Sequence, residues 1–196
     1  MNALRPSARR YIAALSGAAA AVVLFALIRM GAPSLQHVLL AIALTALIAV
    51  AWLFPLPISF KTQLYLDTSV VVAAILTLEP GLAILGAGVG AVVAHRIRKE
   101  DAAQTIFNAS QAMLQAAVGA LVLIAGEWDI GEHEFNSLVM GLVILAAGVA
   151  MILVADLAVA TMVALQSGVS APRSWSQAVI HGDVTERMAQ LAQIGV

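Results

Sequence analysis

The stretch QLYLDTSVVVAAILTLEP, residues 63–80, decides how the whole chain is interpreted. Asp67 and Glu79 bracket its apolar part, and about 16 residues of helix would measure only about 24 Å. A transmembrane helix needs about 20 residues to cross about 30 Å of hydrocarbon. The β-branched residues of YLDTSVVV also suit a strand, but an open strand in lipid would leave backbone groups unpaired. The sequence therefore predicts a short helix over residues 63–79 that is tilted, lies in a thinned bilayer or is sheltered by its neighbours.

The composition places the chain in a membrane. Of its 196 residues, 62% are hydrophobic and 11% are charged, and the mean hydropathy is +0.97. Soluble domains carry about 25% charged residues, and a globule with so few charges could not cover its surface with water-binding groups. The sequence contains no cysteine, which excludes disulfides, thiolate nucleophiles and cysteine-bound metals. It also lacks the basic and aromatic stretches that suit nucleic acid, so nucleic acid is not an expected partner.

Apolar segments at residues 11–30, 38–54, 63–79, 81–96, 105–126 and 138–165 are candidate membrane spans. The predicted fold class is all-α, a polytopic membrane helix bundle of about six transmembrane helices. Lys and Arg set its orientation, because cytoplasmic loops carry more of them. With six crossings and a cytoplasmic N-terminus, the basic residues that fall inside are Arg5, Arg9, Arg10, Lys61, Arg96, Arg98, Lys99 and Arg173. Only Arg29 falls outside, with the acidic loop 127–134, so both termini are predicted to be cytoplasmic.

The chain divides into two predicted parts. Residues 1–165 form the six-span bundle, and its first span is interpreted as uncleaved rather than as a signal peptide. Residues 166–196 form a cytoplasmic segment of amphipathic or interfacial helices, because Gly168 and Pro172 break the last span. The sequence ends on LAQIGV without a capping signal, which we interpret as the sign of a fragment or of a missing further span.

Polar residues within the apolar segments are candidates for a ligand site or a polar intramembrane site. They are Asp67, Asn108, Gln111, Gln115 and Asp156. An ionisable group in a span is costly and is a functional candidate by default. In the structural alternative, the Asp156 side chain joins helices through hydrogen bonds or reaches water near the cytoplasmic end of its span. The Asp67 side chain would then extend to the membrane interface. The three amides recur at i, i+3 and i+7 on one helix face, where such groups join helices more often than they line a cavity.

Glycine spacing predicts close helix packing in GLAILGAGVGAVVAH, where Gly86 and Gly90 lie four residues apart. Small residues let helix backbones approach one another, and a contact within the chain is favoured over a homodimer seam. The sequence holds no catalytic motif, no metal-ligand spacing and no phosphate-binding loop. A non-enzymatic protein without a metal or cofactor is therefore expected.

The order of the segments resembles a known family. The stretches that carry the resemblance are FPLP at 54–57, LDTSVVVAAILTLEPGLAILGAGVGA at 66–91 and FNASQ at 107–111. They are similar to parts of the multi-span N-terminal membrane sensory modules of bacterial HD-GYP phosphodiesterases and GGDEF diguanylate cyclases, over residues 53–165. The resemblance implies that the chain passes an external or membrane cue to a cytoplasmic domain that handles cyclic dinucleotide. The sequence contains no HD-GYP or GGDEF residues, so it would be the sensory part alone or a homologue recruited for another purpose.

Three functions are compatible with these observations. The first is a sensory or scaffold module of the bacterial inner membrane that relays a cue to a fused cytoplasmic output domain or a protein partner. The second is an accessory subunit that packs within a larger membrane complex, such as an energy-transducing or light-harvesting assembly. The third is a small-molecule binding or transport subunit, somewhat like the substrate-binding subunits of vitamin transporters, in which the five polar candidates share a cavity.

Overall fold

The computed structural model describes residues 4–54, 56–59, 62–64, 67–128, 138–170, 172–173 and 176. Its elements are α1 (Pro6–Arg29), α2 (Leu35–Leu53), β1 (Leu56–Ser59), β2 (Thr62–Leu64), α3 (Asp67–Thr77), α4 (Pro80–Ile97), α5 (Ala102–Ala125) and α6 (Leu138–Ser167). The predicted helix bundle is confirmed, with one small hairpin added to it. All of the helices except α3 are long and apolar enough to cross a membrane. The chain is therefore built as an integral membrane protein.

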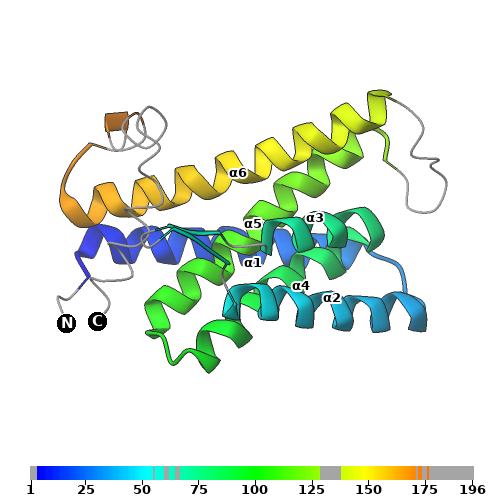
Figure 1. Cartoon of the computed structure of the whole chain (residues 1–196), viewed down its shortest axis with the longest axis horizontal. Helices are drawn as coiled ribbons and strands as arrows, with labels where there is room; N and C mark the ends of the chain where they lie inside the picture. The colour runs from blue at the N-terminus through cyan, green and yellow to red at the C-terminus, as the bar shows by residue number, and fades with distance from the viewer. Residues whose placement is uncertain are drawn as a thin grey trace.

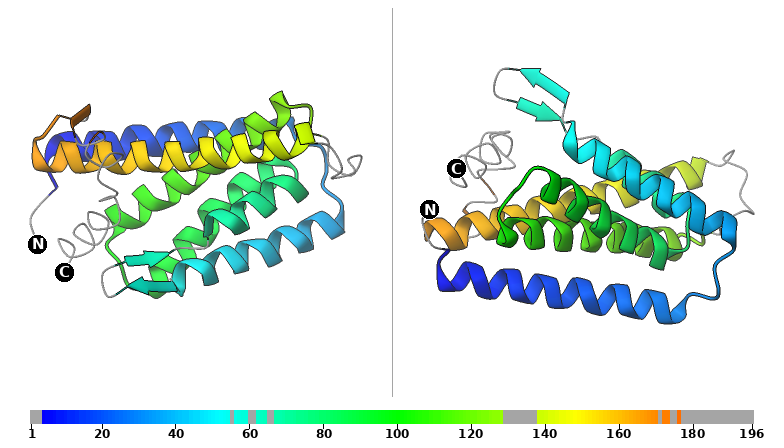
Figure 2. Two further views of the ribbon diagram at one scale, coloured as in Figure 1. Left: turned by 45° about the horizontal axis from the view of Figure 1, so that its top comes forward. Right: turned by 90° about the horizontal axis from the view of Figure 1, so that it is seen from below.

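Successive helices run in opposite directions (Figures 1 and 2). The start of α1, the end of α2, the α4–α5 turn and the end of α6 consequently lie toward the same end of the bundle. We call this the basic end, because the described residues there include Arg5, Arg9, Arg10, Arg96, Arg98 and Lys99. The opposite end holds the α1–α2 connection, Glu79 and Glu127. Helix α5 crosses the bundle obliquely and contacts α1, α4 and α6 (Figure 1).

The decisive stretch of the sequence is helical over a shorter range than predicted. Helix α3 covers only Asp67–Thr77, whereas Gln63 belongs to strand β2, which pairs with β1 in an antiparallel hairpin. The prediction of a helix beginning at residue 63 is therefore wrong. Pro57 lies in β1 opposite Gln63, and a proline cannot donate a helical hydrogen bond, so extended backbone is favoured there.

The short helix α3 is sheltered inside the bundle. Val71, Ala74 and Ile75 are buried, and α3 contacts α2, α4, α5 and α6. A helix that is covered by protein does not have to match the bilayer thickness by itself. The prediction that neighbouring helices shelter this stretch is confirmed for α3, whereas tilt and bilayer thinning stay predictions.

Helix α4 lies between α2 and α5 because its buried face is made almost entirely of small residues. Its buried residues are Gly81, Ala83, Ile84, Gly86, Ala87, Gly88, Gly90, Ala91, Ala94 and His95. A Cβ added to Gly86 would lie 2.7 Å from Thr45 Oγ1, and one added to Gly90 would lie 2.9 Å from the Thr45 carbonyl oxygen. Both glycines therefore face α2 of the same chain, at a separation that no larger side chain allows.

We expect Gly90→Ala to lower the free energy of unfolding by about 1–3 kcal/mol, because the new methyl group would press on the α2 backbone. Gly148→Ala is the matched control, since a Cβ there meets open space, and alanine favours a helix over glycine by about 1 kcal/mol. Denaturant unfolding in detergent micelles measures both changes. Equal stability of the two variants would contradict the close packing of α4 on α2.

Candidate functional site

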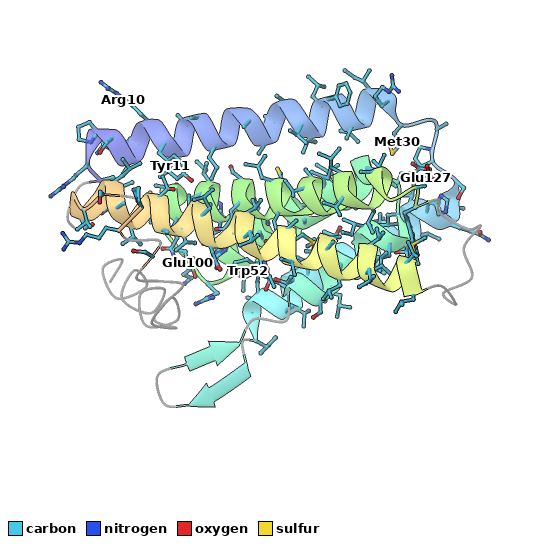
Figure 3. All side chains as sticks on the ribbon, turned by 90° about the horizontal axis from the view of Figure 1, so that it is seen from above. Arg10, Tyr11, Met30, Trp52, Glu100 and Glu127 are labelled. Atoms are coloured by element: carbon cyan, nitrogen blue, oxygen red, sulfur yellow. The ribbon has the colours of Figure 1, made fainter. Side chains whose placement is uncertain are left out.

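A buried histidine at the basic end is the most enclosed ionisable side chain among the described residues. His95 lies in the last turn of α4 and is 1% exposed. Its Nδ1 atom lies 2.5 Å from Glu100 Oε2, and its Nε2 atom lies 3.2 Å from Asn108 Nδ2 on α5. The ring of Trp52 on α2 packs against it, with 4.9 Å between ring centroids. We call these four residues and Arg98 the histidine cluster; Figure 3 labels two of them, Trp52 and Glu100.

The backbone turn after α4 brings Glu100 to the histidine. The Lys99 N–H donates to the Arg96 carbonyl at 3.1 Å, and the Glu100 N–H donates to the His95 carbonyl at 3.0 Å. These are the paired hydrogen bonds of a Schellman motif, which needs a left-handed residue, and Lys99 supplies it with a φ of 58°. The motif usually brings two apolar side chains together at these positions. Here they are His95 and Glu100, so the contact is polar.

Arg98 extends the histidine cluster to the end of α2. Its Nε atom lies 3.0 Å from Glu100 Oε1, and its Nη1 atom donates to the Trp52 carbonyl at 3.5 Å. The Glu100 side chain is 13% exposed and is held between His95 and Arg98. The cluster therefore joins α2, α4 and α5 at the basic end of the bundle.

The hydrogen-bond partners of His95 define its proton arrangement. A carboxylate accepts only, so Nδ1 donates to Glu100. In a neutral ring Nε2 then carries a lone pair and needs a donor, and the Asn108 amide nitrogen faces it. A doubly protonated ring would instead need the Asn108 amide to turn and present its oxygen. The side-chain orientation of Asn108 is thus linked to the charge of His95.

Helix α5 also makes polar ties to α1 and α3. Gln115 Nε2 donates to Thr68 Oγ1 at 3.3 Å, directly beside the buried Asp67 at the start of α3. Ser110 Oγ donates to Ser16 Oγ on α1 at 3.0 Å. Ser110 lies off the face that carries the predicted amides, so the spacing of the amides does not point to it. Polar contacts of this kind join helices where lipid surrounds them.

Two of the five polar candidates have side-chain partners among the described residues. Asn108 contacts His95 and Gln115 contacts Thr68, so both amides already have protein partners. The Gln111 side chain makes no hydrogen bond to another described residue. Asp156 is half-buried on α6, two residues before Ala158, whose carbonyl accepts from the Tyr11 hydroxyl at 3.3 Å.

That contact places Asp156 toward the basic end of the bundle. Tyr11 directly follows Arg9 and Arg10 near the start of α1, where tyrosine typically marks the membrane interface. Counted from Leu138, Asp156 is residue 19 of the 30 in α6, so it lies in the half of that helix nearer the basic end.

The described residues include no group of three side chains that could hold a metal ion. The acidic residues 129, 132 and 134 of the loop between α5 and α6 lie outside the described residues, as does most of the predicted C-terminal segment 166–196.

Comparisons with known proteins add no assignment. No protein-family model matches the chain. No curated protein sequence matches it, and no solved structure matches it. The resemblance to bacterial sensory modules therefore stays a prediction.

We expect Asn108→Leu to lower the free energy of unfolding by about 1–3 kcal/mol, because Nε2 of a buried histidine would lose its partner. Gln111→Leu is the matched control on the same helix, since its amide has no described hydrogen bond, and its effect should stay within about 0.5 kcal/mol. Thermal or denaturant unfolding in detergent provides the measurement. A control variant that is as unstable as Asn108→Leu would mean that the histidine cluster has no special role.

Proposed function

We propose that the chain is a non-enzymatic sensory or scaffold module of the bacterial inner membrane, with six crossings and both termini cytoplasmic. It relays a change in the bundle to a cytoplasmic output domain or protein partner through α6. The proposal has two parts, the orientation in the membrane and the relay, and each rests on its own observation.

The orientation rests on the charges at the two ends. The described basic residues gather at the basic end, apart from Arg29 in the last turn of α1. Positive residues are retained on the cytoplasmic side, so this end faces the cytoplasm. Gly81, at the start of α4, lies against the Ala26 backbone near the end of α1, which puts the α3–α4 connection at the opposite end. Helix α3 therefore counts as a crossing in spite of its length.

Cysteine labelling tests the orientation and the crossing of α3 together, because the native chain has no cysteine. Gly31→Cys lies between α1 and α2, and Ala102→Cys lies at the start of α5; both positions are exposed. With six crossings, a membrane-impermeant maleimide labels Gly31→Cys in intact spheroplasts and labels Ala102→Cys only after permeabilisation. If α3 did not cross, the two cysteines would lie on the same side and label alike.

The relay rests on one observation, the continuity of α6 and its attachment to α1. Helix α6 runs without interruption from Leu138 to Ser167, and 30 residues of helix exceed the thickness of the hydrocarbon core. At the basic end the Arg5 N–H donates to Gln166 Oε1 at 3.2 Å, and the Tyr11 hydroxyl donates to the Ala158 carbonyl. A displacement of α6 at the opposite end would therefore reach the cytoplasmic side along a rigid helix. The resemblance to sensory modules of cyclic dinucleotide enzymes supports the same direction of signalling.

A chimera tests the relay. We expect Tyr11→Phe, in the chain fused at its C-terminal end to a GGDEF diguanylate cyclase domain, to change cyclic dinucleotide output by up to about fivefold, the equivalent of one hydrogen bond. Ser16→Ala is the matched control, because it removes a hydroxyl from the same helix at a contact with α5 rather than α6. The readout is a cellular cyclic dinucleotide reporter at equal protein levels. Unchanged output in both variants would contradict a relay through α6.

The small-molecule binding alternative has less support. It requires the amides of Asn108 and Gln115 to be available to a ligand, whereas both are hydrogen-bonded to neighbouring helices. These contacts are those of side chains that hold helices together.

A further inference from the structure

On two helices, the outward-facing row of residues ends in an arginine at the basic end. On α1 the exposed face runs from Ile28 through Leu24 and Gly17 to Ala13 and ends at Arg10. On α4 the exposed residues Val89, Val92 and Val93 are followed, one turn later, by Arg96 and Ile97. Apolar side chains with this exposure face lipid in a membrane protein. The arginines therefore continue lipid-facing stripes and do not lie on the inner face of the bundle.

Because the stripes are apolar and the arginines end them, these arginines are expected at the level of the phospholipid headgroups. Ile97 is 60% exposed and lies between Arg96 and Arg98, so apolar and basic side chains meet at one level. Tyr11, next to Arg10, lies toward the same end (Figure 3), and tyrosine is enriched at membrane interfaces. A long arginine side chain at such a depth extends its guanidinium group toward the phosphate layer.

Four basic residues at this surface make no ion pair with another described residue. Glu100 is occupied by His95 and Arg98, and Asp101 caps α5 by accepting from the Ala103 N–H at 2.8 Å. Arg9, Arg10, Arg96 and Lys99 are exposed and take part in no ion pair between described residues. We call these four residues the basic rim. Uncompensated positive charge at headgroup height calls for an anionic partner.

We infer that the basic rim binds the headgroups of anionic phospholipids. Clusters of Lys and Arg directly beside transmembrane helices attract such lipids through their phosphate charge. The partner is lipid and not an acidic protein, because exposed apolar side chains of α1 and α4 lie one turn from the basic residues. Acyl chains cover those apolar side chains while the phosphate meets the guanidinium groups. The inference depends on the membrane orientation and does not require the sensory role.

Lipid selectivity in reconstituted vesicles provides the test. The full chain is placed in phosphatidylcholine bilayers, and spin-labelled phosphatidylglycerol and phosphatidylcholine report the relative association constant of the two lipids at the protein surface. We expect phosphatidylglycerol to be preferred, with the preference falling by up to about fivefold for each charge removed. The variants are Arg9→Gln with Arg10→Gln, and Arg96→Gln with Lys99→Gln. The preference should also decrease as salt rises from about 0.05 to about 0.5 M, because salt screens exposed charges.

Arg29→Gln is the matched control, since it removes an exposed arginine from α1 at the opposite end. Its preference for phosphatidylglycerol should fall by less than that of either double variant, because it removes one charge that is not part of a cluster. Equal association of the two lipids with the unmodified chain would overturn the inference, as would an equal loss in Arg29→Gln. A competition experiment uses a soluble oligoglutamate peptide and glycerol phosphate at the same total charge. If only the peptide removes the preference for phosphatidylglycerol, the basic rim is a peptide site and the lipid inference is overturned.

Discussion

The backbone hydrogen bond in lipid is the constraint on which this structure depends. Hydrocarbon offers no partner to an N–H or C=O group, so each apolar segment must satisfy its backbone internally. Where the sequence cannot form a helix, the backbone is paired in another way. Pro57 interrupts the chain after α2, and the hairpin pairs the backbone of Leu56–Ser59 with that of Thr62–Leu64. Helix α3 begins only at Asp67 and relies on neighbouring helices to cover it.

Once the helices exist, packing and polar contacts hold them together, because lipid removes most of the hydrophobic drive between them. Helix α4 provides the packing, through glycines and alanines that let α2 approach to the distance set at Thr45. Helix α5 provides the polar contacts, through Asn108 to α4, Ser110 to α1 and Gln115 to α3. The two helices at the centre thus have different tasks, and the outer helices α1, α2 and α6 are mainly exposed to the membrane.

The basic end combines several features that bear on function. The histidine cluster joins α2, α4 and α5 there, the start of α1 is bonded to the end of α6, and the residues of the basic rim lie on α1 and at the α4–α5 turn. The proposed relay and the inferred lipid contact therefore concern one region of the molecule.

The sequence by itself determined the membrane class, the positions of the long helices and the gathering of basic residues, because these follow from composition and from apolar length. It also selected Asn108 and Gln115 as polar, but it could not name their partners. Only the tertiary structure decided that Glu100 returns to His95, since this depends on the left-handed turn at Lys99, and that Asn108 meets the same ring from α5. Contacts between residues far apart in the chain depend on how the helices pack, and no local pattern records that packing. The same reason explains why apolar length alone predicts a helix at residue 63, where the structure pairs Gln63 with Pro57 in a hairpin.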